Sequence, residues 1–405
     1  MKGDKSMNNK RLFILLGLLI LSILMLAGCG EDTGGDTEEQ SDADSDSAGE
    51  ADLPEEITMS TYDVGSGGYT QLSAISDTIM SEYGTQIHMI PNDSGLARLE
   101  PLRDGNADFG GRVADEVYFA FEGIEEFATP EWGPQDLQYM YPILNHFGLL
   151  VLDDSEYETF DDLEGARVPH IIGNPSVNIK IVGLLAAAGL TMDDVEVVEV
   201  TSYTDQPEMV AQGEIDVAGI VPSAATVQEA DELHGMRWMD HSILEDDEAL
   251  EALHEIYPFG VADETDIGGA LTEGEPEHLL GYTSYAPAAY SDTDPDLVYN
   301  WLVALDETFD DYSQATADMF VWDVEESQPE PLGVPIHEGG VRFFEEQGMW
   351  NEEYEEQNNQ LIERQEQLQE AWDVVTEEAE EQGLSDDEFT EYWLERKEEL
   401  VDDVE

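Results

Sequence analysis

Apolar and polar residues alternate with two periods along the chain, and these periods predict strands and helices in regular succession. Residues 57–62 alternate as a strand, a glycine-rich turn follows, and residues 69–83 carry helical spacing. Strands are predicted again at 87–90 and 107–111, on either side of a short helix at 96–103. This β-α-β-α-β order is typical of an α/β lobe.

A second, smaller α/β set is predicted farther along the chain. It follows the apolar run at 143–152, which has the length of a strand and can cross from one lobe to another. Its elements are a helix start at 159–163, strands at 168–172, 195–200 and 216–221, and a helix at 179–188. The alternation again indicates an α/β lobe.

The boundaries between the two lobes follow from where the alternation of strands and helices stops and where it resumes. Residues 223–280 are acidic and show no clear period, so we expect them to be irregular. A helix predicted at 297–309 packs back on the first lobe. We therefore assign residues 55–150 and 261–350 to lobe 1, and residues 151–260 to lobe 2.

The last part of the chain, residues 351–405, has a different pattern. Apolar residues recur every seven positions, at Tyr354, Leu361, Leu368 and Val375. The spacing predicts one long amphipathic helix over 351–382, which Gly383 ends. A capping box from Ser385 to Glu388 begins a final helix. This acidic helical extension is a hairpin laid against the lobes, a docking surface for a partner, or a self-association helix.

The N-terminus has the features of a secretion signal. Bases within residues 2–11 precede an apolar run at 12–26, and Leu26-Ala27-Gly28-Cys29 follows. Because the run would span only about 22 Å as a helix, it is short for the roughly 30 Å core of a bilayer. We expect residues 1–28 to be a signal peptide and Cys29, the only cysteine, to carry a lipid anchor. An ordinary signal peptide or an uncleaved anchor is the alternative.

Acidic residues dominate the composition. The chain has 95 acids against 14 Lys and Arg, a formal net charge of −81, which excludes nucleic acid as a partner. Residues 29–54 are acidic, contain no aromatic residue and should form a solvated linker from the lipid anchor to the lobes. Elsewhere acids accompany ample apolar residues, which indicates a folded protein adapted to high salt rather than a disordered one.

Two features indicate an anion site. The turn Gly65-Ser66-Gly67-Gly68-Tyr69 lies between a predicted strand and helix, where free N–H groups favour a carboxylate or phosphate, although such turns are also common without a ligand. It matches neither a Walker loop nor a dinucleotide fingerprint. Arg98, Arg103 and Arg112 cluster in lobe 1, where a guanidinium could bind a carboxylate or simply pair with one of the many acids.

Motifs for metal binding or catalysis are missing from the sequence. The eight His residues form neither HxxxH nor HExxH, and the acidic clusters do not follow the order of a calcium loop. There is no Gly-x-Ser-x-Gly elbow, and the sole cysteine is assigned to the anchor. We therefore expect no cofactor, no dedicated metal site and no enzymatic activity.

Four segments, in order, resemble the TAXI family, the solute receptors of TRAP-type transporters. The most specific is Pro335-Ile336-His337-Glu338-Gly339-Gly340-Val341-Arg342-Phe343-Phe344 with Gly348, which is similar to the family's "P-x-H-x-G-A-x-x-Y-Y... G". The others are the turn at 65–69, Leu102-Arg103-Asp104-Gly105-Asn106-Ala107-Asp108 with Asp115, and Gln212-Gly213-Glu214-Ile215-Asp216-Val217 with Pro222. The similarity covers residues 55–350.

This resemblance implies a type II periplasmic-binding-protein-like fold, in which two α/β lobes joined by crossing strands close like a hinge. It implies an extracytoplasmic receptor, in the periplasm or on the outer cell surface. Such a receptor delivers its solute to TRAP membrane permease subunits driven by an ion gradient. Family ligands are small carboxylates such as glutamate, glutamine or dicarboxylic acids. An ABC-type receptor of similar fold and a surface-structural lipoprotein without a ligand are the alternatives.

The candidate ligand-binding residues combine the turn, the arginines and the positions that match the family. They are Gly65, Ser66, Gly67, Gly68, Tyr69, Ser94, Arg98, Arg112, Asp115, Asn174, Ser176, Asn178 and Pro222. Asp115 could select an amino group or cap a helix. Arg98 stands where the family usually has Asn, and the turn at 173–178 replaces its "G-S-G-T", so a changed specificity is expected.

Overall fold

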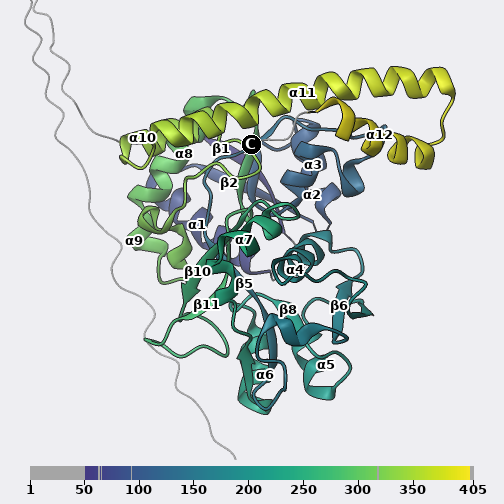
Figure 1. The fold of residues 1–405 in the computed structure, drawn as a ribbon. Coiled ribbons are helices and arrows are strands. Elements are labelled where there is room, and N and C mark those ends of the chain that lie inside the picture. The colour runs from purple at the N-terminus through teal and green to yellow at the C-terminus, as the bar shows by residue number, and fades with distance from the viewer. Residues whose placement is uncertain (1–50, 63, 65, 93, 317–318, 402–405) are drawn as a thin grey trace, which may run out of the picture. The chain divides into compact units, whose positions relative to one another are not determined.

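The computed structural model describes residues 51–62, 64, 66–92, 94–316 and 319–401. The predicted signal peptide, Cys29, Gly65 and nearly all of the predicted linker lie outside the described residues. The described residues form two lobes, each built around its own sheet, and a C-terminal helical extension (Figure 1).

Lobe 1 contains a five-stranded sheet in the order β2-β1-β3-β12-β4. Its strands are β1 (Glu56–Tyr62), β2 (Gln86–Asn92), β3 (Phe109–Val113), β4 (Leu137–Tyr139) and β12 (Ala286–Tyr290). Its helices are α1 (Gly67–Tyr83), α2 (Gly95–Arg103), α3 (Glu116–Glu122), η1 (Glu125–Phe127), α8 (Pro295–Glu307), α9 (Phe309–Tyr312), η4 (Met319–Trp322), η5 (Val324–Glu326) and α10 (Glu338–Glu346). Because β1 runs parallel to β2 and β3, the helices that follow these three strands begin at one edge of the sheet.

Lobe 2 contains a second sheet, in which β10, β11, β5 and β8 follow one another and β9 also pairs with β5. Its strands are β5 (Asn145–Leu152), β8 (Ala218–Ile220), β9 (Met236–Trp238), β10 (Gly260–Thr265) and β11 (Glu277–Tyr282), and a separate parallel pair is formed by β6 (Arg167–Ile171) and β7 (Glu196–Val200). Its helices are η2 (Phe160–Leu163), α4 (Pro175–Ala187), α5 (Gln206–Gln212), α6 (Ala225–His234), η3 (Ser242–Glu245) and α7 (Asp247–His254). The predicted α/β character of both lobes is confirmed.

The expectation that residues 223–280 are irregular is wrong. This stretch contains α6, β9, α7, β10 and β11, in which β10 pairs with β11 and β11 pairs with β5. Its helices have eight to ten residues and its strands three to six, so the apolar period is too brief to recognise in the sequence. The second sheet therefore extends to Tyr282, past the expected end of lobe 2 at residue 260, and the chain returns to the first sheet with β12.

Two of the TAXI-like segments, residues 102–108 and 212–217, each hold a strand of one lobe by a hydrogen bond to its backbone. Gly105 and Gly213 take positive φ angles of 66° and 68°, which a glycine adopts without strain. Three residues later, the carboxylate of Asp108 accepts a hydrogen bond from the backbone N–H of Thr58 in β1 (2.7 Å). Asp216 accepts one from the N–H of Arg167 in β6 (2.8 Å). The repeated Gly-x-x-Asp pattern is therefore explained by strand anchoring.

The segment most similar to the TAXI pattern is explained by close packing of α10. The imidazole of His337 accepts a hydrogen bond from the N–H of Gly339 and so caps the helix. A Cβ added at Gly339 would lie 2.6 Å from the carbonyl oxygen of Pro295, and one at Gly340 would lie 2.4 Å from that of Met140. Side chains at these two positions would push the helix away from lobe 1.

The predicted C-terminal helices are confirmed. The long helix α11 (Glu352–Gln382) begins after its cap Asn351 and ends at Gly383, and α12 (Asp386–Leu400) follows the capping box of Ser385 and Glu388. In Figure 1 α11 runs along lobe 1 and α12 folds back beneath its far end. Of the three roles considered for this extension, the hairpin packed on the protein is the one that the contacts show.

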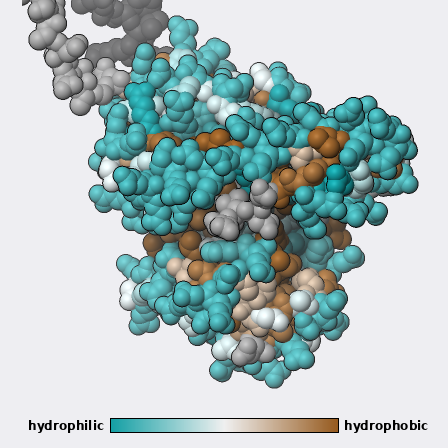
Figure 2. Space-filling model, turned by 45° about the horizontal axis from the view of Figure 1, so that its top comes forward, coloured by the Kyte–Doolittle hydropathy of each residue, from teal (hydrophilic) through white to brown (hydrophobic). Residues whose placement is uncertain are grey.

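Hydrophilic residues cover most of the face seen in Figure 2, as the acidic composition leads one to expect. Within the part of the chain that the structure describes, no helix has both the length and the apolar character needed to cross a bilayer. Across the same residues, no group of three or more His, Cys, Asp or Glu side chains is arranged to hold a metal ion.

Candidate functional site

A small cavity lies where the two lobes meet. Its volume is about 70 Å³, which is room for a small polar group or a few water molecules. Lobe 1 contributes Tyr62, Gly95, Arg98, Glu116, Phe119 and Glu126, and lobe 2 contributes Gly173, Asn174, Pro175 and Ser176. Three of the candidate residues, Arg98, Asn174 and Ser176, therefore line one cavity although they come from different lobes.

Three helices begin around this cavity. Ser94 caps α2 by accepting a hydrogen bond from the N–H of Ala97 (3.3 Å), and Asn174 caps α4 by accepting one from that of Val177 (3.1 Å). Asp115 occupies the cap position of α3 without making a side-chain cap bond. Because a helix carries partial positive charge at its N-terminus, the 13-residue α4 favours a negative group at the lobe 2 wall of the cavity.

Arg98 is buried in the lobe 1 wall. Its Nε donates to Glu116 (2.6 Å), and its guanidinium stacks 3.6 Å from the ring centre of Tyr62. Burial alone would lower the pKa of Arg98, but the carboxylate of Glu116 outweighs this effect and raises it. Arg98 therefore pairs with an acid, as one of the two alternatives from the sequence had it. Both members of this pair, Arg98 and Glu116, also line the cavity.

Glu126 also lines the cavity, and sequence reasoning missed it. Its carboxylate lies against Gly95, where an added Cβ would be 2.8 Å from Oε1, and the side chain of Glu116 approaches the same glycine. Burial and then the charge of Glu116 raise the pKa of Glu126. One base and two acids thus line the cavity, an unexpected balance for a pure anion site.

Directly beside the cavity, a buried ion pair joins the lobes. Asp115, fully buried in lobe 1, accepts from the ammonium of Lys180 on α4. The same carboxylate accepts from the hydroxyls of Ser176, Tyr257 and Ser284. Asp115 was a candidate for binding an amino group, and the amine that it binds here is the protein's own.

Lys180 was not a sequence candidate, although it has an unusual setting. Its ammonium lies 4.9 Å and 4.5 Å from the ring centres of Tyr257 and Tyr282 and also donates to the carbonyl of Ser176 (3.1 Å). Burial lowers the pKa of Lys180, and Asp115 offsets only part of that shift. A lone lysine within the apolar helix predicted at 179–188 was the available signal.

Arg112 lies near the cavity but does not line it. Its guanidinium donates to the side chains of Gln71 and Asn145, the latter at 2.7 Å, and stacks 4.1 Å from the ring centre of Tyr285. Because Asn145 begins β5, this arginine connects the first sheet to the strand that crosses into lobe 2. Arg103, the third arginine of the cluster, lies over the ring of Trp132.

The described residues of the glycine-rich turn do not line the cavity. Ser66 caps α1 by accepting from the N–H of Tyr69 (3.1 Å), and Tyr69 is half-buried. Gly67 is exposed, whereas an added Cβ at Gly68 would lie 2.1 Å from the hydroxyl oxygen of Tyr285. Here the missing side chain makes room for a tyrosine of the same protein.

The other lobe 2 candidates, Asn178 and Pro222, are not among the residues of the cavity wall. The amide of Asn178 bonds both the N–H and the carbonyl of Ile171 and so fixes the turn that precedes α4. Pro222 is buried, and its Cβ lies 2.5 Å from the place of an added Cβ on Gly268.

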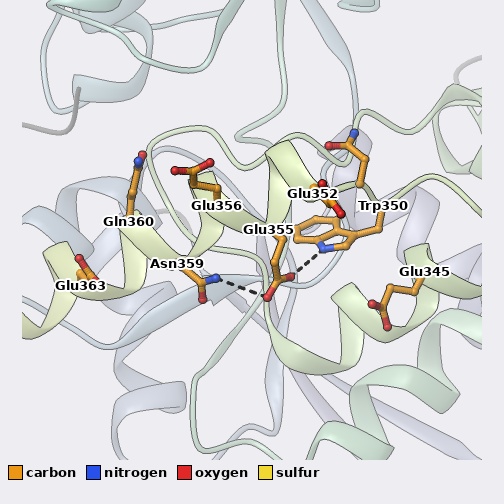
Figure 3. A pocket seen from close by; sticks show the side chains of 9 residues that line it. Glu345, Trp350, Glu352, Glu355, Glu356, Asn359, Gln360 and Glu363 are labelled. Atoms are coloured by element: carbon orange, nitrogen blue, oxygen red, sulfur yellow. Dashed lines mark hydrogen bonds between the residues drawn. The ribbon is translucent and has the colours of Figure 1, made fainter.

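A larger hollow, of about 800 Å³, lies at the start of α11 (Figure 3). It is lined by Glu345, Trp350, Asn351, Glu352, Glu355, Glu356, Asn359, Gln360 and Glu363. Its five carboxylates and lack of a base would repel an anion. We therefore place the candidate site in the smaller cavity, where both lobes and a buried arginine meet.

Comparison with known proteins finds one family and several distant structures. A model of the NMT1-like family matches residues 62–348, more than two thirds of the chain. None of the curated proteins matches this chain. The periplasmic aliphatic sulphonate binding protein SsuA from Escherichia coli is 17% identical, with a TM-score of 0.43 over 73% of this chain and 88% of that one. The substrate binding domain 2 of Lactococcus lactis GlnP, in an open conformation, is 11% identical, with a TM-score of 0.37 over 66% and 95%.

Proposed function

The chain belongs to the NMT1-like family, and we propose that it is an extracytoplasmic solute-binding receptor whose lobes close on a small molecule in the cavity between them. The observation that carries the proposal is the origin of the cavity wall, which combines lobe 1 residues with the first turn of α4 in lobe 2. Only when the lobes approach does such a site form, so ligand affinity and closure are linked.

The groups around the cavity favour a solute that carries both charges. A carboxylate fits the N-terminus of α4 beside the hydroxyl of Ser176. Arg98 donates from Nε to Glu116 and from Nη1 to the carbonyl of Asn92. Its Nη2 carries two more N–H groups that can donate to a carboxylate. An ammonium group fits the carboxylate of Glu126, which lies in the lobe 1 wall. The solute class is therefore a small amino acid of the glutamate or glutamine type, and because the cavity measures about 70 Å³ here, the lobes must lie farther apart when such a solute is bound.

Replacing Glu126 with glutamine tests this assignment. We expect the affinity for L-glutamate to fall at least about tenfold, because a charge-assisted hydrogen bond is lost, while succinate, which has no amine, changes less than about threefold. Titration calorimetry at multimolar KCl measures both. Glu131→Gln is the matched control, since Glu131 is exposed in the same segment. If Glu126→Gln weakened L-glutamate and succinate equally, or if Glu131→Gln weakened L-glutamate as much as Glu126→Gln does, the assignment of Glu126 as the ammonium partner would be wrong.

The pH dependence of binding follows from the same carboxylate. Because the pKa of Glu126 is raised, this group takes up a proton at a higher pH than an ordinary glutamate. The ionised form binds the ammonium group, so L-glutamate affinity should decrease as the pH is lowered through that pKa. Glu126→Gln should lack this step, and a wild-type protein without it would contradict the assignment.

For the transporter partner, we propose the membrane permease subunits of a TRAP-type system, with attachment to the membrane through Cys29. The support is the order of the four TAXI-like segments and the lipoprotein pattern of residues 26–29. An ABC-type receptor is the alternative. A gene neighbourhood that encodes an ATPase, with no TRAP membrane subunit, would decide for that alternative.

A further inference from the structure

One segment of lobe 1 carries half of that lobe's cavity residues. Glu116 and Phe119 lie on α3, and Glu126 lies in the following turn, η1. After α3 the backbone has little regular structure, with positive φ angles at Gly123, Glu125 and Gly133. Turns satisfy most of its N–H groups within the segment, whereas several of its carbonyls are left for partners from outside it.

The C-terminal extension supplies these partners to the backbone. Three carbonyls accept hydrogen bonds from side chains of α11 and α12: Gly123 from the indole of Trp393 (2.6 Å), Ala128 from the hydroxyl of Thr390 (2.7 Å) and Pro134 from the amide of Gln369 (2.7 Å). Glu126 lies between the first two anchored carbonyls. The extension thus holds the backbone on both sides of this cavity residue.

The far end of α3 is held as well. Glu122 is buried and pairs with Arg364 of α11 (2.6 Å) and Lys397 of α12 (2.6 Å). Burial would raise the pKa of Glu122, but the hydrogen bond from Arg364 and the charge of Lys397 together lower it. The helix α3, which begins at Glu116 beside the cavity, is therefore fixed at its other end by two cations of the extension.

Aromatic packing completes the contact. The ring of Trp372 covers Gly133 so closely that an added Cβ would lie 2.3 Å from it. The same ring makes edge contacts with Phe389 and Trp393, with centroid distances of 5.0 Å and 4.8 Å. The hydrogen bond from Trp393 to Gly123 is buried among these side chains, and burial strengthens it.

We infer that the C-terminal extension positions the solute cavity, with Trp393, Thr390 and Gln369 as positioning residues for the segment that carries Glu126. This inference rests on the proposed function of the cavity. The extension lies after residue 348, outside the part of the chain matched by the family model. An addition beyond the two lobes thereby sets the geometry of one wall of the site.

Trp393→Phe in the full chain tests the inference, because it removes the indole N–H and keeps an aromatic ring. Hydrogen exchange at multimolar KCl should become at least about fivefold faster for residues 123–136 and stay unchanged in α4 of lobe 2. The control is Tyr392→Phe, since Tyr392 donates to Glu378 within the extension. Unchanged exchange at 123–136 in Trp393→Phe would overturn the inference.

Binding gives a second readout that a merely structural role would not produce. Trp393→Phe should weaken L-glutamate about five- to tenfold and leave succinate within about twofold, because the displaced group is the ammonium partner Glu126. Equal weakening of both probes would overturn the positioning role. If the wild-type protein binds neither probe, the proposed solute fails, and the exchange result alone decides whether the extension holds the segment.

Discussion

Replacing Lys180 with methionine is expected to lower the free energy of unfolding by about 3–5 kcal/mol, because the buried carboxylate of Asp115 is left without its cation. Methionine has a similar length and keeps the contacts with Tyr257 and Tyr282, so little of the loss comes from packing. Urea unfolding at multimolar KCl measures the difference. Since Lys180 and Asp115 belong to different lobes, the variant should also separate the lobes more easily.

A double variant separates the charge effect from other causes. Asp115→Asn combined with Lys180→Met removes both charges and should recover more than half of the lost stability, because no buried charge remains unpaired. Small-angle scattering of the single variant should give a larger radius of gyration than that of wild type. A Lys180→Met protein within about 1 kcal/mol of wild type would contradict the account of this pair as a lock between the lobes.

The melting temperature should rise by at least about 10 °C between dilute buffer and multimolar salt, equivalent to several kcal/mol for a protein of this size. A formal charge of −81 repels itself strongly when the Debye length is about 10 Å, and much less when it falls to about 3 Å at 1 M. Thermal unfolding followed by circular dichroism measures the rise.

Screening predicts more than the direction of this change. Salts with different monovalent cations should act alike at equal ionic strength, because the Debye length depends on ionic strength rather than on the ion. The rise should also flatten once the charges are screened. A melting temperature that is the same in dilute and multimolar salt would contradict adaptation to high salt.

Much of the fold could be predicted because the signals are local. Caps and stop residues such as Asn351, Gly383 and Ser385 act within one turn, and the structure begins and ends helices there. Strand β3 lies two residues later than expected, because Asp108 precedes it as an anchor for β1. The strands β10 and β11 were missed since both are short and β11 joins the sheet through β5, which lies far away in the sequence.

The site was less predictable, because its chemistry depends on distant pairings. Arg98 was identified from the cluster of arginines, and Asn174 and Ser176 from the turn that stands in place of the family's "G-S-G-T". These three residues line one cavity. The roles of Lys180 and Glu126 depend on contacts that form only when the two lobes meet, so they could not be predicted from neighbouring residues. No local pattern distinguishes Glu126 from the many other acids. The role of the glycine-rich turn as an anion cradle stays a prediction, since Gly65 is not described and Gly68 contacts Tyr285.

Calorimetric titration of the wild-type protein at multimolar KCl, with L-glutamate, L-glutamine and succinate as probes, tests the central claim most directly. A receptor that closes on a small amino acid in the cavity between its lobes should give a saturable heat with one of the two amino acids, and a weaker one with succinate. No saturable heat with any of the three would contradict the account.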